Sequence, residues 1–473
     1  MATVTSVDVS SITTQEAYQE HLKRLKGEIE KRNNKTVEQL FQEKQKRLWD
    51  AMTMKEPDRV PVILGGTFFA CKYGKLPYSS VYYDPIRWKA AYAQMMADYE
   101  PDTWGTAGGQ SGAALDIIQA KNILWPGGTL PPDVPQQNID GEYMKEDEYD
   151  LFLEDFTDFY VRRYLPRVYG ALAPLANLPA MGGGLGGGIQ GIANLFSDPE
   201  FAKVAQTMRK YNEEQAKFRH ASGNHTADMA VLGLPPTSEG PAVGGGGGPG
   251  VGSGAAAGAA AAPGGGGPGG PAFDQLANTY RGWKGIVTDM YRRPDKLIAA
   301  MEKITKGPLD RLTPADPNRR GPQFSGGGAI HRGSDRFLSR KQWETFYWPT
   351  WKRGMMKAIE LGYRVNIFAE GFCEERFEYF LELPKGKVMI RFTDTNMFKA
   401  KEVLGNHCAL MGSVPLTLLQ MGSPSEVDEF CKKMIMVCGK GGGYILRADT
   451  DFIQEARPEN VKAMVDSVKK YHP

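Results

Sequence analysis

Cysteine is scarce in this chain. Its 473 residues include five cysteines, an odd number with no paired spacing: Cys71, Cys373, Cys408, Cys431 and Cys438. A disulfide framework is therefore not expected, and a reducing cytoplasm is the expected compartment.

A charge excess and a long apolar run are also missing. The 57 basic and 55 acidic residues nearly cancel, so the chain has no basic excess with which to neutralise a nucleic acid. No apolar run approaches the roughly 20 residues that span a membrane. The N-terminus has no basic segment followed by an apolar stretch, and no signal peptide is predicted. We expect a soluble protein with no nucleic-acid or membrane partner.

What the chain does contain is a series of short apolar runs, each followed by polar residues and then by a helix-length stretch. The runs are Gly328–His331, Val365–Glu370, Val388–Thr393, Ala409–Ser413 and Tyr444–Leu446. Earlier strands are predicted at about 60–65, at 102–105 and, less clearly because of Pro179, at 175–181. Strands that alternate with helices favour a parallel sheet, and the length favours an α/β fold with a closed (β/α)₈ TIM barrel.

The predicted organisation is an N-terminal helical extension over residues 1–55 and a barrel over 56–473. Two insertions interrupt the barrel. Residues 122–165 are expected to form a hairpin and a helix. Residues 240–271, almost entirely Gly, Ala and Pro, form a low-complexity insertion that cannot bury a core.

Chemistry in such barrels is located where strands give way to helices. The residues at these positions form the candidate active site: His331, Arg332, Asp335, Glu370, Cys373, Thr393, Asp394, Ser413, Asp449 and Asp451. Glu370 is either functional or paired with Arg364, Arg376 or Arg391. Asp335 either orients His331 or caps the helix that begins near Ser339.

Two further groups extend this site. Phe68, Phe69 and Trp104 follow the first two strands and suit a flat apolar substrate, although they are equally consistent with core positions. Cys373, with Glu370 and His331, forms an alternative Zn²⁺ site, for which helix packing is an equally good explanation of Cys373.

Several stretches, in this order, resemble the uroporphyrinogen decarboxylase-like superfamily. They are Glu56-Pro-Asp-Arg-Val-Pro-Val62, Asp289-Met-Tyr-Arg-Arg-Pro-Asp295, His331-Arg-Gly-Ser-Asp335, Lys399-Ala-Lys-Glu-Val-Leu-Gly405, Met411-Gly-Ser-Val-Pro415, Gly422-Ser-Pro-Ser-Glu-Val427, Gly441-Gly-Gly-Tyr-Ile-Leu446 and Pro458-Glu-Asn-Val-Lys-Ala-Met464. The resemblance covers about residues 36–470 and implies a (β/α)₈ barrel. The superfamily includes the decarboxylase of haem synthesis and corrinoid-dependent methyltransferases.

In this superfamily, decarboxylation and methyl transfer to a thiol require different residues. The decarboxylases carry arginines after strand one, where residues 65–74 of this chain contain Lys72 as the sole cation. The thiol-methylating members bind Zn²⁺ at positions occupied here by Phe368, Glu370 and Thr450.

The remaining branch implies a methyltransferase that removes a methyl group from a small methoxylated or methylated substrate and passes it to cobalamin on a corrinoid protein. On this hypothesis Glu370 and His331 supply the acid, with the pKa of Glu370 raised, and Asp449 assists them. The other rim residues bind substrate: Phe68, Phe69, Trp104, Arg332, Asp335, Arg391, Asp394, Ser413 and Asp451. Zn²⁺ remains an alternative cofactor, and a homo-oligomer is expected. The alternative activity is a decarboxylase or other lyase that acts on a small carboxylic acid without cobalamin.

Overall fold

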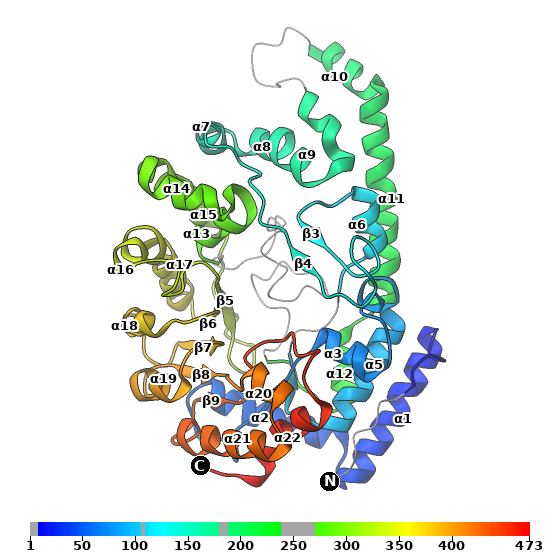
Figure 1. Ribbon diagram of the computed structural model, residues 1–473, viewed down its shortest axis with the longest axis vertical. Helices are drawn as coiled ribbons and strands as arrows, with labels where there is room; N and C mark the ends of the chain where they lie inside the picture. The colour runs from blue at the N-terminus through cyan, green and yellow to red at the C-terminus, as the bar shows by residue number, and fades with distance from the viewer. Residues whose placement is uncertain (1–7, 106–108, 179–187, 238–269) are drawn as a thin grey trace.

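A five-stranded parallel sheet lies in the C-terminal half of the protein in the computed structural model (Figure 1). The structure describes residues 8–105, 109–178, 188–237 and 270–473. The strands of this sheet lie in chain order, and all neighbours are parallel. They are β5 (Phe324–Ile330), β6 (Arg364–Ala369), β7 (Val388–Phe392), β8 (Ala409–Met411) and β9 (Tyr444–Ile445). The five strands predicted from the apolar runs are therefore confirmed, with ends that shift by a few residues.

Two N-terminal strands continue this sheet beyond β9. β1 (Ile63–Leu64) pairs in parallel with β2 (Thr103–Trp104). The Ile63 N–H donates to the Leu446 carbonyl at 2.9 Å, and Val62 forms a parallel bridge with Leu446. The spatial order is therefore β2-β1-β9-β8-β7-β6-β5, a parallel α/β arrangement in which the first strands meet the last.

Helices surround the sheet (Figure 1). Those of the N-terminal part are α1 (Gln15–Asn33), α2 (Val37–Met52), α3 (Thr67–Tyr73), α4 (Ser80–Tyr83), α5 (Pro85–Tyr99) and α6 (Gly112–Ile118). Those of the middle part are α7 (Tyr149–Glu154), α8 (Phe156–Phe159), η1 (Tyr160–Tyr164), α9 (Leu165–Val168), η2 (Gly170–Asn177), α10 (Gly188–Ser197), α11 (Pro199–Ser222), α12 (His225–Val231), α13 (Ala272–Gln275), η4 (Leu276–Arg281), α14 (Gly282–Arg292) and α15 (Pro294–Asp310). Those of the C-terminal part are α16 (Arg340–Gln342), η5 (Trp343–Tyr347), α17 (Trp348–Glu360), η6 (Glu374–Arg376), α18 (Phe377–Phe380), α19 (Met397–Leu404), α20 (Leu416–Met421), α21 (Pro424–Cys438) and α22 (Pro458–Lys470).

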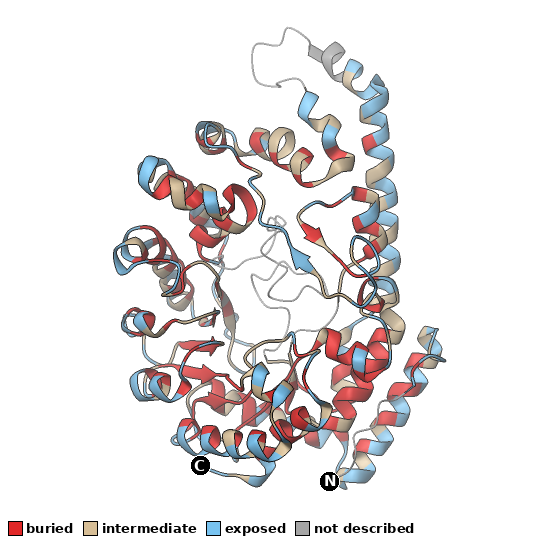
Figure 2. Cartoon of the chain, viewed as in Figure 1, coloured by how far each residue is buried: buried red, intermediate tan, exposed pale blue. Residues whose placement is uncertain are grey.

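Helix starts follow local sequence signals. Thr36, Ser339 and Ser423 each form a complete capping box with the residue three positions later. On α21 the apolar face is buried and the helix packs against α19 and α22, and Figure 2 shows that the inward sides of the helices are buried in general. All five cysteines are buried and unpaired, and Cys431 and Cys438 lie on that buried face of α21.

The prediction of a third strand at 175–181 is wrong for the residues that the structure describes. Leu175–Asn177 belong to the 3₁₀ helix η2, and residues 179–181 lie outside the described residues. A short apolar run does not by itself distinguish strand from helix, and here the helical alternative is adopted. The insertion expected at 240–271 also lies outside the described residues up to 269.

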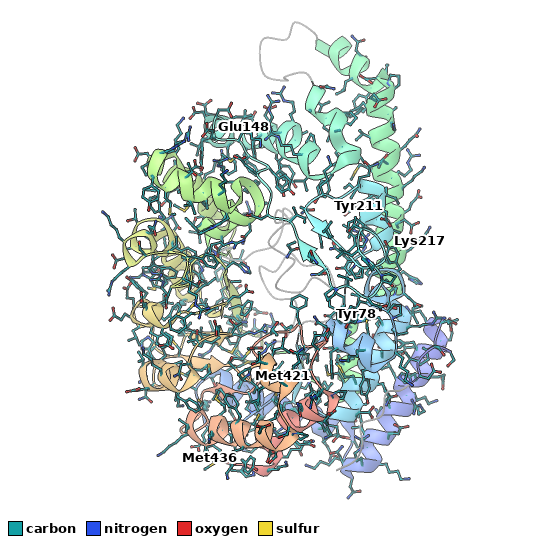
Figure 3. The ribbon with its side chains drawn as sticks, in the orientation of Figure 1. Tyr78, Glu148, Tyr211, Lys217, Met421 and Met436 are labelled. Atoms are coloured by element: carbon teal, nitrogen blue, oxygen red, sulfur yellow. The ribbon has the colours of Figure 1, made fainter. Side chains whose placement is uncertain are left out.

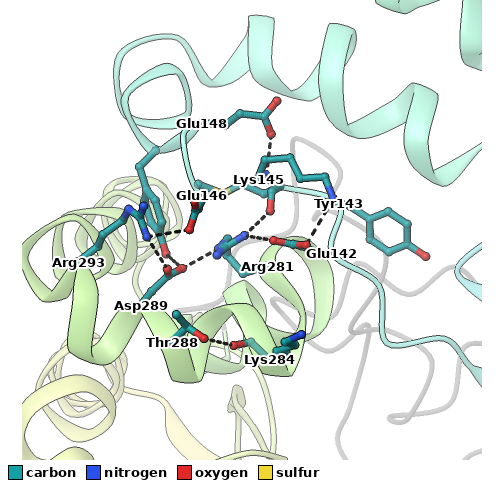
Figure 4. A network of polar contacts seen from close by, with 12 residues as sticks. Glu142, Tyr143, Lys145, Glu146, Glu148, Arg281, Lys284, Thr288, Asp289 and Arg293 are labelled. Carbon is teal, nitrogen blue, oxygen red and sulfur yellow. Dashed lines mark hydrogen bonds and ion pairs between the residues drawn. The ribbon is translucent and has the colours of Figure 1, made fainter.

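The region 122–165 begins with the antiparallel strands β3 (Ile123–Leu124) and β4 (Gln137–Asn138) and continues through α7, α8 and η1. A buried arginine ties it to the following part of the chain (Figure 4). Arg281 donates to Asp289 at 2.6 Å, to Glu142 at 2.6 Å and to the Met144 carbonyl at 2.6 Å. Tyr149 also donates to Asp289, at 2.8 Å, so both segments share one polar network.

The long helix α11 borders this region (Figures 1 and 3). Lys217 points to solvent from α11 with its side chain 72% exposed. Among the helices that the structure describes, none is long and apolar enough to cross a membrane.

Glycines at the ends of β1 and β2 create space for an acidic side chain. A Cβ on Gly65 would lie 2.4 Å from Oδ1 of Asp451, and one on Gly105 would lie 3.0 Å from the Gly65 Cα. Side chains at these positions would displace the carboxylate, so the close approach requires glycine.

Gly65→Ala is expected to destabilise the protein by about 1–3 kcal/mol, because the new methyl group overpacks a site that cannot expand freely. Gly27→Ala on α1 is the control: nothing lies within 4 Å of the position that its new methyl group would take, and the change is expected to be neutral or stabilising by up to about 1 kcal/mol. Urea denaturation of both variants measures the difference. Equal stabilities would contradict the proposed overlap with Asp451.

Candidate active site

Two predicted catalytic residues meet at the carboxyl ends of adjacent strands. Ile330 pairs with Ala369 in the β5–β6 register, so His331 and Glu370, the next residues, emerge side by side. Nδ1 of His331 lies 2.5 Å from Oε2 of Glu370. In the described residues, Nε2 of His331 has no hydrogen-bond partner, and the side chain is 20% exposed. The imidazole is thus held through one nitrogen and open at the other.

Asp274, on α13, fixes the backbone of this site and is not selected by any sequence pattern. Its carboxylate accepts the N–H of His331 at 2.7 Å and that of Arg332 at 2.9 Å. It also accepts the Tyr347 hydroxyl at 2.6 Å. Asp274 is almost completely buried, and this burial raises its pKa despite those hydrogen bonds and the nearby His331. By accepting these three hydrogen bonds, Asp274 holds the main chain of His331 and Arg332 in place at the end of β5.

The pKa shifts of His331 and Glu370 contradict the expectation that the pKa of Glu370 is raised. Burial alone would raise the pKa of Glu370, but its hydrogen bond to His331 and the charges of His331, Arg391 and Arg332 outweigh that effect and lower it. Burial alone would lower the pKa of His331, but Glu370 and the Asp274 charge raise it. The predicted raised pKa of Glu370 is therefore wrong. These shifts favour a carboxylate at Glu370 and a protonated imidazole at His331, which makes His331 the candidate proton carrier of the pair.

Glu370 also does not form a direct ion pair with any of the three arginines that were expected as its partners. Its direct partner is His331 rather than Arg364, Arg376 or Arg391. Arg376 is fully buried, where it donates to the carbonyls of Gly333 and Leu338. Arg364 donates to the Gly386 carbonyl. Of these three arginines, Arg391 is the one whose charge lowers the pKa of Glu370.

A second cluster lies behind the pair and contains Arg391, Asp451 and Arg447. Arg391 donates to Asp451 at 2.8 Å and stacks its guanidinium 4.4 Å from the Phe368 ring centroid. Arg447 also donates to Asp451. Burial opposes ionisation of Asp451, yet the two arginines lower its pKa. Burial and Arg391 lower the pKa of Arg447 to about 10.

Arg447 is not among the predicted site residues, although its position in the sequence carries a signal. It directly follows the apolar run of β9, in the same strand-end position that selects Asp449. Two guanidiniums thus share the single carboxylate of Asp451, and Nε of Arg391 is buried without a partner among the described residues.

Asp449 and Ser413 lie at the ends of β9 and β8, respectively. Asp449 accepts the Leu416 N–H at 3.1 Å with one oxygen, and its other oxygen is buried and unpartnered among the described residues. Burial raises the pKa of Asp449. Ser413 donates to the Thr393 carbonyl at 2.5 Å. The catalytic role of Asp449 stays a prediction.

Two predicted rim residues have structural partners instead. Asp335 neither orients His331 nor caps the helix after Ser339. It accepts the Glu375 N–H at 2.9 Å and lies 3.1 Å from Arg376. Asp394 is 63% exposed and pairs with Arg336 at 3.0 Å. Both carboxylates are held by neighbours that follow the strand ends.

The aromatic candidates are dispersed. Phe68 and Phe69 are buried on α3; Phe68 packs 5.0 Å from Tyr78, which Figure 3 labels, and Phe69 packs against Tyr99. Trp104 contacts the His225 ring edge-on at 4.9 Å. Arg332 stacks over Trp283 at 5.5 Å, beside the pair. Of the predicted substrate-binding residues, Arg332 therefore lies directly next to His331.

The residues present do not fit a Zn²⁺ site. Among the described residues, no group of three or more His, Cys, Asp or Glu side chains is arranged to hold a metal ion. Cys373 is fully buried, its thiol contacts the Glu370 carbonyl at 3.9 Å, and burial raises its pKa. Because metal binding requires the thiolate, this thiol is a poor ligand. Cys373 instead packs in the core.

Comparison with known proteins finds a family match in the C-terminal half of the chain. Residues 265–471 match the family described as Uroporphyrinogen decarboxylase (URO-D). The matched part of the chain contains β5–β9, His331 and Glu370 and is similar to this family. The predicted resemblance is confirmed, and with it the α/β fold class, since that family fold is a (β/α)₈ barrel.

Solved structures extend the likeness to most of the chain. A methyltransferase from Methanosarcina mazei aligns over 90% of this chain and 98% of its own length, with a TM-score of 0.50 and 13% sequence identity. At this identity the likeness concerns the fold. No curated protein matches the sequence.

Proposed function

We propose that this protein is a methyltransferase that demethylates a small methoxylated or methylated substrate and passes the methyl group to a corrinoid protein. The observation that carries the proposal is the His331–Glu370 pair, an imidazolium with one nitrogen open, at the carboxyl ends of β5 and β6. The fold shared with the methyltransferase from Methanosarcina mazei supports the class of reaction.

The chemistry requires an acid for the leaving atom. An alkoxide or phenoxide is a poor leaving group unless it is protonated as the bond to the methyl carbon breaks. Nε2 of His331 donates that proton, and the electron pair of the broken bond stays on the substrate oxygen. Glu370 retains its negative charge throughout and holds Nδ1, while Asp274 fixes the main chain.

Cobalamin would be carried by the partner protein and would supply the nucleophile that accepts the methyl group. This chain then has to bind the substrate and deliver the proton. Arg332, beside His331, is the predicted contact for a polar substituent of the substrate.

True porphyrinogen decarboxylation is disfavoured by the segment after β1. Lys72, its sole cation, is exposed and donates to the Gln454 carbonyl at 3.1 Å. A lysine engaged in this way does not reproduce bidentate recognition of several carboxylates.

A lyase that acts on a smaller carboxylic acid is the second candidate. The two guanidiniums that share Asp451, with the Nε of Arg391 that has no partner among the described residues, favour a bound carboxylate. A lyase would release carbon dioxide or another small product from the acid without any cobalamin.

The proposed function is tested with Glu370→Gln. Glutamine retains a hydrogen-bond acceptor for Nδ1 but removes the charge that raises the pKa of His331. Methyl transfer needs the imidazolium, so activity falls as pH rises through the His331 pKa. The variant is expected to shift this fall to lower pH and to lose about tenfold or more of its rate at neutral pH.

The measurement is methyl transfer to cob(I)alamin across a pH series, with a histidine NMR titration of the same samples. Glu378→Gln is the matched control, because Glu378 is 71% exposed and pairs with Arg340 at the surface. A wild-type rate and an unchanged pH profile in Glu370→Gln would remove this pair from the mechanism.

A further inference from the structure

A cavity of about 250 Å³ lies at the end of the sheet opposite His331. It is lined by α1, α2, the end of α5, the segment after α12 and the end of α22. Arg59 and Glu100, which line it, precede β1 and β2, whereas His331 and Glu370 follow their strands. The cavity is therefore separate from the candidate active site.

The lining is rich in cations, and most of them already have counterions. Arg47 contacts Asp58 and Asp102, each at 2.6 Å. Arg59 contacts Asp102 at 2.7 Å, and its Nη2 makes a second contact at 2.8 Å. Both guanidinium groups are therefore committed to fixed carboxylates.

The two outer lysines are also paired. Lys35 lies 2.7 Å from Glu43, and Lys469 lies 3.6 Å from Glu100. Lys44 differs: it has neither an ion pair nor a hydrogen bond to any residue that the structure describes. It is the cation of the lining that is left without a counterion in the described part of the chain.

Lys44 occupies an unusual position on α2. Leu40 and Leu48, one helical turn before and after it, are buried. Residues four apart lie on the same face of a helix, so Lys44 interrupts an apolar stripe that faces the protein. Burial lowers the pKa of Lys44 to about 8, although the charges of Asp102 and Glu100 oppose this change. Lys44 is only partly buried, and its ammonium group lines the cavity without a fixed counterion among the described residues, so it can attract an anion there.

We propose that this cavity binds a small oxyanion, of the phosphate, sulfate or carboxylate type, with Lys44 as its counterion. An ammonium acts as a point charge that suits a compact anion. The guanidinium groups of Arg47 and Arg59 are already bound to carboxylates. They therefore add positive electrostatic potential to the cavity but make no direct bidentate contact with the anion. The site goes beyond the proposed function, because no step of methyl transfer uses it.

The test uses the full-length protein and sulfate as the probe, titrated at neutral pH against potassium chloride of equal ionic strength. Sulfate is expected to raise the Tm of the wild type above the chloride value, as a ligand specific to the folded state does. In Lys44→Gln the sulfate affinity is expected to fall about tenfold or more, as for loss of a charge-assisted hydrogen bond. Lys44→Arg should retain binding.

The matched control is Lys46→Gln. Lys46 is on the same helix, but its side chain is 78% exposed and pairs with Asp50. It should keep the full response to sulfate. A repeat with acetate distinguishes a carboxylate site from a site for tetrahedral anions, and a response to either that depends on Lys44 supports the proposal. No response beyond chloride, or equal responses in Lys44→Gln and Lys46→Gln, would overturn it.

Discussion

Replacement of His331 by Gln is expected to lower the rate of methyl transfer from a methoxylated substrate by about 10²–10⁴-fold. In the proposed mechanism His331, paired with Glu370, protonates the leaving atom, and glutamine cannot donate such a proton. The measurement is the rate of transfer to cob(I)alamin under saturating substrate. His220→Gln, on the exposed side of α11, is the matched control and should retain the wild-type rate.

The choice of methyl donor sharpens this experiment. A quaternary ammonium donor leaves as a neutral amine and needs no proton. If the donor is bound at all, its transfer rate should be nearly the same in His331→Gln and in the wild type. An equal loss with both kinds of donor would show that His331 acts by positioning or folding and not as an acid.

Replacement of Asp451 by Asn is expected to destabilise the protein by about 3–5 kcal/mol, the cost of leaving a buried ion-pair partner uncompensated. Arg391 and Arg447 both depend on this carboxylate, and both are almost fully buried. Urea denaturation monitored by circular dichroism measures the change.

Asp394→Asn provides the comparison, because Asp394 also follows a strand and pairs with an arginine. Its partner Arg336 is 68% exposed, and the expected cost is only about 0–1 kcal/mol. Similar costs for the two variants would mean that the arginines find other partners or water when Asp451 is lost.

The strands of the C-terminal half could be predicted because each combines a short apolar run with a polar exit. β6 and β7 fall within a residue of the predicted runs at each end. The start of β5 at Phe324 is missed, since the residues that follow include Gly326, Gly327 and Gly328, which are typical of a loop. Gly328 has a positive φ of 83°, and the β5–β6 register shifts between Gly326 and Gly328. These glycines mark an irregular strand and not its absence.

The site was predictable where it depends on strand order. His331 and Glu370 follow adjacent parallel strands, so their meeting follows from topology. Asp274 could not be found this way, because it lies on the four-residue helix α13 next to the low-complexity segment. The charge states also depend on three-dimensional contacts: the direction of the Glu370 pKa shift is set by His331, Arg391 and Arg332, which sequence spacing does not place at known distances.

The pairing of β1 with the end of β9 has a consequence for biosynthesis. Ile63 donates to Leu446 across nearly the whole length of the chain, and Val62 bridges the same residue. During translation the first strand leaves the ribosome long before its neighbour exists, so its edge stays open until the last strand emerges. A nascent chain stalled before residue 444 should therefore be protease-sensitive around β1 and a natural client for chaperones.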